Sequence, residues 1–246
     1  WFVDGAVGVA RKLKISDFVI GAAIVGVGTS MPELVVSFIG AIGGNADVAI
    51  GNVIGSNVFN VLGILGLTAI FFPVAIDKSN MKFEIPFCIG VSLLVTVLAF
   101  NFFNGSAISI SRIDGMVLLL CFAGFMWYSF ARDRKNQSKS AEVVEEEKTP
   151  MWLAIVKVVG GLALLITSCD LFVDNAVVIA KSFGVNDAFI SLTLIACGTS
   201  LPELVTTLTA IRKKENSLSV GNIIGANIID TTLILPLCAV INGHPL

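Results

Sequence analysis

Long runs of apolar residues, separated by short polar segments, make up most of this chain. They lie at about 18–42, 48–72, 83–103, 113–131, 151–180, 188–211 and 218–241, and residues 1–13 resemble the end of another run. A helix needs roughly 20 apolar residues to cross the hydrocarbon core of a bilayer. Runs of this length with few internal charges predict an all-α polytopic membrane protein.

The composition agrees with a membrane location. Hydrophobic residues make up 55% of the chain and charged residues only 14%, whereas about a quarter of the residues in a soluble domain are charged. A net charge of −2 without a basic patch predicts no nucleic-acid partner. The single histidine, His244, lies beyond the last apolar run, and the five cysteines show no CxxC spacing. We therefore expect buried structural cysteines and no metal site built on nitrogen or sulfur.

Two motifs occur twice. The segment GTSMPELV at 28–35 returns as GTSLPELV at 198–205, and GNVIGSN at 51–57 returns as GNIIGAN at 221–227. The offset is 170 residues in both cases (198 − 28 and 221 − 51), and it holds without a gap from residue 1 to residue 66. Similar composition alone does not reproduce ordered Gly, Thr, Ser, Pro, Glu and Asn positions, so the sequence predicts an internal duplication.

The number of spans sets the relative orientation of the two copies. Five predicted spans separate the opening helices of the copies, and an odd number turns the second copy upside down. The loop charges agree, because most basic residues lie on the side of the polar segment 132–150: Arg11, Lys12, Lys14, Lys78, Lys82, Arg132, Arg134, Lys135, Lys139, Lys148, Arg212, Lys213 and Lys214. The other side has only Arg112 and Lys181. The positive-inside rule then predicts a multi-pass protein of the plasma (cell inner) membrane with a cytoplasmic linker.

We divide the chain into a first inverted repeat at 1–131, a cytoplasmic linker at 132–150 and a second inverted repeat at 151–246. The first helix of the first copy is expected to begin before Trp1. The counterpart of the run at 83–103 would start at residue 253 (83 + 170), beyond Leu246. A five-plus-five architecture is therefore expected, with about eight of ten helices in this sequence; a natural eight-span protein is the alternative.

Each copy places a glutamate inside an apolar run, Glu33 in the first and Glu203 in the second. A carboxylate at this depth costs several kcal/mol unless it is paired, protonated or bound to a cation. Pro32 has no backbone N–H and disrupts the helix one turn back, which is expected to open carbonyls around 26–28, and around 196–198 in the second copy. Open carbonyls at membrane depth are typical of an ion pathway.

The helix after each glutamate adds a line of polar residues at every fourth position. In the first copy this line is Asn52, Ser56 and Asn60, and in the second it is Asn222, Ala226 and Asp230. Because the copies are inverted, we expect both lines to meet around one oxygen-lined cavity that contains Glu33, Glu203 and Asp230. Carboxylate, hydroxyl and carbonyl oxygens are the ligands that calcium prefers.

These motifs resemble the two α-repeats of the calcium/cation antiporter superfamily, in particular prokaryotic-type sodium/calcium exchangers. The resemblance implies a ten-helix inverted-repeat fold and alternating access, with calcium and sodium competing for one cluster of sites. It implies Glu33 and Glu203 as the central calcium carboxylates, and the following residues as their neighbours in the ion sites: Thr29, Thr199, Gly26, Ala196, Ser30, Ser200, Ser56, Asn60 and Asp230. One position departs from the family pattern, because Ala226 stands where a serine is expected.

The predicted function is secondary active antiport of calcium against sodium, without enzymatic chemistry or a cofactor. The predicted partners are the two ions and the lipid bilayer, and no protein partner is implied. Protons could replace sodium as the counter-ion in the same fold, and a passive cation channel is a further alternative. An intramembrane aspartyl protease is disfavoured, because no second aspartate stands in a matching motif.

Overall fold

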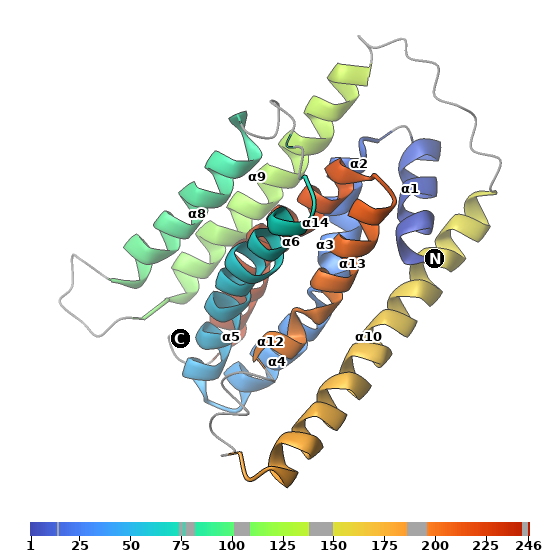
Figure 1. The fold of residues 1–246 in the computed structure, drawn as a ribbon. Coiled ribbons are helices and arrows are strands. Elements are labelled where there is room, and N and C mark those ends of the chain that lie inside the picture. Colours follow the sequence, from blue (N-terminus) through green and yellow to red (C-terminus); the bar gives the residue numbers. More distant parts are fainter. Residues whose placement is uncertain are drawn as a thin grey trace.

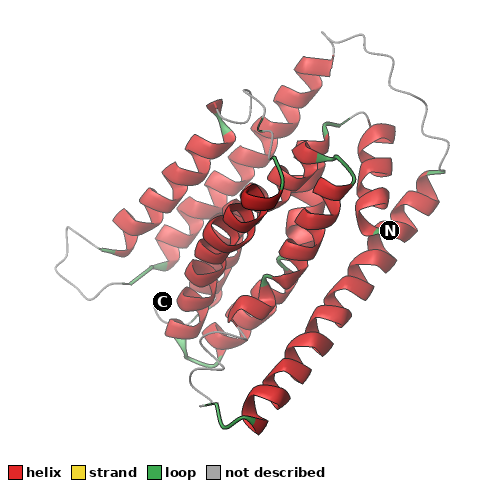
Figure 2. Cartoon of the chain, viewed as in Figure 1, coloured by secondary structure: helices red, strands yellow, loops and turns green. Residues whose placement is uncertain are grey.

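The computed structural model describes residues 1–13, 15–73, 76, 82–100, 109–137, 150–185, 196–242 and 246. These residues form helices joined by short loops and include no strand (Figure 2). In this part of the chain, four helices are long and apolar enough to cross a membrane: Ala46–Phe71, Arg112–Arg132, Met151–Ser182 and Asn216–Ile241. A bent pair, Phe18–Thr29 and Met31–Ile42, can count as a fifth span. The predicted all-α membrane class is confirmed.

The first repeat contains the following elements in order: α1 (Phe2–Leu13), α2 (Asp17–Ile20), the π-helical turn η1 (Gly21–Val25), α3 (Gly26–Thr29), α4 (Met31–Ile42), α5 (Ala46–Val58), the π-helical turn η2 (Phe59–Leu65), α6 (Gly66–Phe71), α8 (Glu84–Ala99) and α9 (Arg112–Gln137). The described part of the second repeat contains α10 (Met151–Ser182), α12 (Ala196–Thr199), α13 (Leu201–Arg212), α14 (Asn216–Ile229), the π-helical turn η4 (Asp230–Ile234) and α15 (Leu235–Ile241). The π turns η2 and η4 fall at equivalent places in the two copies, and each lies inside an otherwise α-helical span.

The hairpins α4–α5 and α13–α14 close with the same turn. The amide of Asn45 donates to the carbonyl of Gly40 at 2.9 Å, and the amide of Glu215 donates to Ala210 at 2.9 Å. Gly44 and its counterpart Lys214 both have positive φ, at 74° and 64°. Lys214 is an uncommon residue for this left-handed conformation, which glycine adopts most easily. The two turns lie at opposite ends of the molecule (Figure 1), as an inverted repeat requires.

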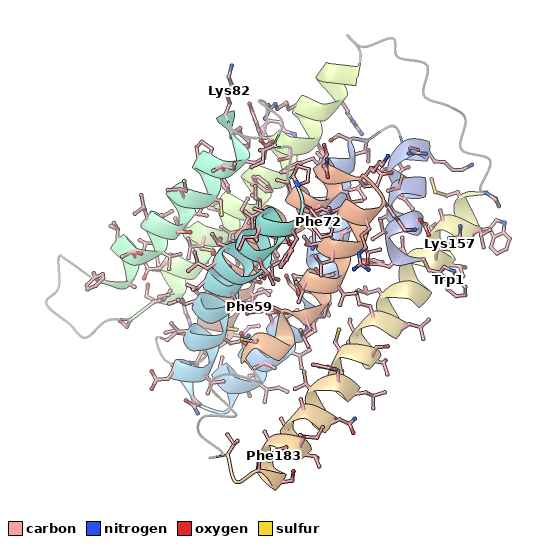
Figure 3. All side chains as sticks on the ribbon, in the orientation of Figure 1. Trp1, Phe59, Phe72, Lys82, Lys157 and Phe183 are labelled. Atoms are coloured by element: carbon pink, nitrogen blue, oxygen red, sulfur yellow. The ribbon has the colours of Figure 1, made fainter. Side chains whose placement is uncertain are left out.

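A core of broken helices lies between two outer layers (Figure 1). On one side α1 packs chiefly against the long helix α10, and Trp1 and Lys157, both labelled in Figure 3, mark the crossing. Gly161 allows this close approach, because a Cβ there would lie 2.7 Å from the backbone nitrogen of Phe2. On the other side α8 and α9 pack against α14, η4 and α15.

The structure changes some of the predicted boundaries. The run at 18–42 is not one straight helix, because it bends by 48° between Thr29 and Met31. The helix α9 continues into the predicted linker and ends at Gln137, since the segment after Arg132 contains no glycine or proline. The linker at 132–150 stays a prediction. Arg132 itself donates from Nη1 to Glu84 Oε1 on α8 at 3.0 Å. Residues 138–149 of the predicted linker and 188–195 of the predicted span lie outside the described residues.

Candidate cation-binding site

Each repeat interrupts its glutamate helix at a serine. Ser30 separates α3 from α4 with φ −80° and ψ 10°, and Ser200 separates α12 from α13 with φ −90° and ψ 8°. Pro32 follows in the first turn of α4, where its missing N–H leaves no intrahelical bond unmade. A new helix therefore begins inside the molecule, and Glu33 lies in its first turn near the positive end of the helix dipole. Glu203 has the same place in α13.

The two glutamates are held by serines of the opposite repeat. Ser200 Oγ donates to Glu33 Oε1 at 2.9 Å, and Ser30 Oγ donates to Glu203 Oε1 at 3.1 Å. The glutamate side chains are almost completely buried, with 1% and 0% exposed. Neither carboxylate is thus positioned by its own copy alone, so the site exists only where the two repeats meet.

Asn52 of α5 ties together three elements of the site. Its Nδ2 donates to the backbone carbonyl of Glu33 at 3.2 Å and to Ser37 Oγ at 2.9 Å. Its Oδ1 accepts from Thr199 Oγ1 of the other repeat at 3.4 Å. Asn222 makes the equivalent contacts, to the carbonyl of Glu203 at 3.3 Å, Thr207 Oγ1 at 3.1 Å and Thr29 Oγ1 at 3.2 Å. The two asparagines therefore fix the position of both threonine hydroxyls beside the carboxylates.

A second layer of polar contacts joins the α5 span to the α14 span. Asn60 Nδ2 donates to Asn227 Oδ1 at 3.0 Å, and Asn57 Nδ2 donates to Thr231 Oγ1 at 2.8 Å. The Nδ2 of Asn227 also contacts the backbone carbonyl of Asn57 at 3.5 Å. These bonds lie next to Asp230, whose side chain is fully buried.

Several buried oxygens of this region accept no hydrogen bond from the described residues: Glu33 Oε2, Glu203 Oε2, both oxygens of Asp230, Asn60 Oδ1 and Ser56 Oγ. Each glutamate has one oxygen bonded to a serine and the other unpartnered. Buried polar groups are nearly always satisfied in folded proteins. A cluster of unpartnered oxygens, several of them carboxylate, fits a bound cation as the missing partner.

No basic side chain neutralises these acids among the described residues, since the ion pairs found there involve Asp4, Glu84 and Glu215 instead. Three ionised carboxylates in one buried region would repel each other and lose their hydration. No group of three Asp, Glu, His or Cys side chains in the described part is arranged to hold a metal ion by itself. A cation here would therefore need hydroxyl, amide or carbonyl oxygens in addition to the carboxylates.

The predicted polar lines are both buried. Asn52, Ser56 and Asn60 are at most 8% exposed, and Asn222, Ala226 and Asp230 are completely buried. Ala226 supplies no hydroxyl where Ser56 does in the other copy.

The predicted open carbonyl at Gly26 is already engaged, because it accepts from the Ser30 amide at 3.0 Å and from Thr29 Oγ1 at 3.4 Å. A carbonyl has two lone pairs, and both of these donors come from its own helix turn. The expectation that the proline break leaves this carbonyl unbonded is wrong. Ala196 is the first residue of α12, immediately after the undescribed segment. Roles for Gly26 and Ala196 as ion ligands stay predictions.

The central place of Asn52, Asn222 and Asn227 does not follow from the sequence pattern along one helix. Asn52 and Asn222 belong to the polar lines, but their bonds reach across the repeat interface and carry no signal in a single helix. The matching GNxIGxN motif could have indicated them, since it repeats both asparagines at the same offset.

The chain matches a family model described as "Sodium/calcium exchanger protein" over residues 1–131 and 153–246. It is 41% identical over 239 residues to the "Putative antiporter CaxA" of Alkalimonas amylolytica, covering 95% of this chain and 73% of that protein. It is 32% identical over 269 residues to the "Sodium/calcium exchanger MaX1" of Methanosarcina acetivorans, covering 96% and 77%.

Solved structures of the sodium-calcium exchanger NCX_Mj show the same fold. One of them, from crystals soaked with zero Na⁺ and Ca²⁺, superposes with a TM-score of 0.84 at 32% identity and covers 100% of this chain and 77% of that chain. The match therefore extends over both repeats.

Proposed function

Because this chain belongs to the sodium/calcium exchanger family, we propose that it is a secondary active antiporter that exchanges calcium for sodium. Membership of the family makes it a cation antiporter, and the proposal adds the two ions. The observation that carries the proposal is the cluster of buried oxygens at the repeat interface. In this cluster Glu33 and Glu203 each have one oxygen without a hydrogen-bond partner among the described residues. Hard oxygen ligands with carboxylates are the set that calcium prefers and that sodium also accepts.

The two glutamates are the central calcium ligands in this mechanism. Glu33 Oε2 and Glu203 Oε2 bind the divalent ion between the repeats, with Thr29 and Thr199 beside them. Sodium ions use the same carboxylates together with Asp230, Asn60 and Ser56. Calcium and sodium compete because a carboxylate that binds one ion cannot neutralise the charge of the other at the same time. Ser30 and Ser200 hold the other carboxylate oxygens in place throughout.

Transport requires that the loaded site open to one side of the membrane at a time. The inverted arrangement supports this, because the two repeats present nearly equivalent surfaces in opposite directions. We place the protein in the plasma (cell inner) membrane with the linker end in the cytoplasm. The basis is the excess of lysine and arginine on the linker side.

The test is calcium uptake into vesicles that contain the purified protein. Sodium-loaded vesicles are diluted into sodium-free buffer with radioactive calcium, and choline-loaded vesicles with an outward proton gradient form the matched set. We expect uptake above electrochemical equilibrium only in the sodium-loaded vesicles, and its loss when a sodium ionophore collapses the gradient. Uptake that never exceeds equilibrium and needs no counter-ion would instead indicate a passive channel.

One observation favours protons as a second candidate counter-ion. The buried Ala226 removes a hydroxyl that Ser56 supplies in the other copy, so one side of the site has fewer oxygens for sodium. Carboxylates can carry protons without such a hydroxyl. In the same assay this alternative predicts calcium uptake that follows the proton gradient and does not respond to sodium.

A further inference from the structure

The hydrogen bonds of the two glutamates and of Asn52 and Asn222 follow the repeat symmetry. Those that join the α5 span to the α14 span do not. Asn60 Nδ2 donates to Asn227 Oδ1 at 3.0 Å. Shifting each residue by 170 and exchanging the copies gives the equivalent pair, Asn57 and Asp230. In this pair residue 230 takes the place of the donor and Asn57 takes the place of the acceptor. Because an ionised carboxylate cannot donate, the pair can form only if the Asn57 amide donates to Asp230. No such bond is present among the described residues, and Asn57 Nδ2 donates instead to Thr231 Oγ1 at 2.8 Å.

Thr231 has no polar counterpart in the other copy. The equivalent residue is Val61 (231 − 170), which has no group to accept a hydrogen bond and is 44% exposed, whereas Thr231 is 4% exposed. The hydroxyl at 231 is thus present in one copy only, next to the one acid that also lacks an acidic counterpart. Both oxygens of Asp230, and also Asn57 Oδ1, accept no hydrogen bond from the described residues.

A hydrogen bond from the Asn57 side-chain amide to Asp230 would oppose cation binding. A donor on a carboxylate forms a charge-assisted hydrogen bond, which is about twice as strong as a neutral one. It would stabilise the empty carboxylate, and an incoming cation would have to displace it. The Thr231 hydroxyl offers the Asn57 amide a different acceptor and so leaves both Asp230 oxygens for an ion.

We propose that Thr231 is a positioning residue that keeps Asp230 available to the transported cation by holding the Asn57 amide away from it. This inference rests on the proposed cation site and assigns to Thr231 a role that concerns affinity rather than the helix fold. It predicts that the effect of removing the hydroxyl depends on whether Asn57 is present.

The test is a double-mutant cycle on the purified protein, read by equilibrium binding of radioactive calcium and by competition with sodium. Thr231→Val keeps the side-chain shape and removes the hydroxyl, and we expect it to weaken binding about tenfold, the effect of one charge-assisted hydrogen bond. Thr231→Ser keeps the hydroxyl and should bind as the original protein does. In the double variant Thr231→Val with Asn57→Leu, the competing amide is gone, and we expect affinity to return to within about twofold.

Ser92→Ala provides the matched control. Ser92 lines the same groove as Thr231, between α5 and α8, but its hydroxyl donates to the Cys88 carbonyl of its own helix. This control should leave calcium binding unchanged. An equal loss for Thr231→Val with and without Asn57→Leu would show that Thr231 acts through packing, and it would overturn the inference. An unchanged affinity in Thr231→Val would also overturn it.

Different results would contradict the proposed function and this inference. If the original protein binds no calcium and transports none, both the proposed function and the inference are wrong. If the original protein binds and transports calcium but the cycle shows no coupling between Thr231 and Asn57, only the inference is wrong.

Discussion

Two equivalent helices of the repeat have very different surroundings. The span Ala46–Phe71 combines α5, η2 and α6, and 28% of the residues in its apolar 18-residue window are buried. In the 18-residue window of its counterpart Asn216–Ile241, which combines α14, η4 and α15, 83% are buried. Both have 26 residues, and both contain a π turn at the same place. Sequence similarity alone would predict similar burial, so the difference must come from the neighbours of each helix.

The outer helices α8 and α9 of the first repeat pack mainly against the second repeat. They pack against α14, η4 and α15 (Figure 1). The helices α2 and η1 also pack closely against α14, because a Cβ on Gly221 would lie 2.5 Å from the Phe18 carbonyl oxygen. On the α5 span, by contrast, Ile54, Val58 and Leu62 are more than half exposed. The α14 span of the second copy is thus buried largely by helices of the first copy.

The largest expected effect comes from removing either central charge. Glu33→Gln and Glu203→Gln should each reduce sodium-dependent calcium uptake by a hundredfold or more, because a buried cation loses a carboxylate partner worth on the order of 3 kcal/mol or more. If the two copies contribute equally to the site, the two losses will be similar despite the unequal burial of the neighbouring α5 and α14 spans. Near-normal uptake in either variant would remove that residue from the site.

A substitution in the tightly packed helix α14 should have the next largest effect, on the stability of the protein. Gly225→Ala places a Cβ 2.4 Å from the Cα of Ala22, a contact that backbone movement alone can relieve. We expect a fall of about 5 °C or more in the melting temperature in detergent, following a loss of about 1–3 kcal/mol. Gly90→Ala on α8 is the control, because no described atom lies within 4 Å of its Cβ position. Equal melting temperatures for the two variants would contradict the close approach of η1 to α14.

Substitutions at the equivalent positions Ser56 and Ala226 should have a moderate effect on sodium affinity. Ser56→Ala removes a buried oxygen that has no hydrogen-bond partner among the described residues, and Ala226→Ser adds one at the equivalent place. One such ligand is worth about 1 kcal/mol, so we expect sodium affinity to fall about fivefold in the first variant and to rise by a similar factor in the second. The measurement is the sodium concentration that gives half-maximal inhibition of calcium binding. No change in either variant would mean that sodium does not use these positions.

The smallest effect is expected at the linker end of the molecule. Lys213 pairs with Asp4 of α1, and Arg11 Nη2 lies 3.6 Å from Glu215 Oε1. At the opposite end, the counterparts of Lys213 and Glu215 are the uncharged Gly43 and Asn45. Exposed pairs contribute only about 0.2–1 kcal/mol and weaken with salt.

If exchange moves α1 and α10 against the core, Lys213→Ala should raise the uptake rate up to about fivefold at low ionic strength. The difference should shrink in high choline chloride, and calcium affinity should not change. A charge exchange, Asp4→Lys with Lys213→Asp, should restore the original rate. A variant that loses calcium affinity would show that this pair supports the site rather than the motion.

The sequence predicted the parts of the fold that depend on local pattern. The apolar runs, the duplication and the buried polar lines follow from periodicity and motif spacing. The helix break at Ser30 was less predictable, because Pro32 indicates a disruption but does not give its angle or say which carbonyls remain bonded.

The contacts across the interface could not be predicted from one repeat. The bond from Asn52 to Thr199, the diversion of Asn57 to Thr231 and the unequal burial of α5 and α14 all depend on how inverted copies face each other. A pattern along one helix specifies which face is polar, but it does not specify the partner of each oxygen.

The π turns η2 and η4 begin at or beside the two polar residues Asn60 and Asp230. A π turn contains one residue more than an α turn, and one residue corresponds to about 100° of rotation around a helix axis. Movement of this extra residue along the span would therefore redirect Asn60 or Asp230, while the helical segments on either side keep their positions. Such local rewinding would change the direction of an ion ligand, and it would break only a few backbone hydrogen bonds.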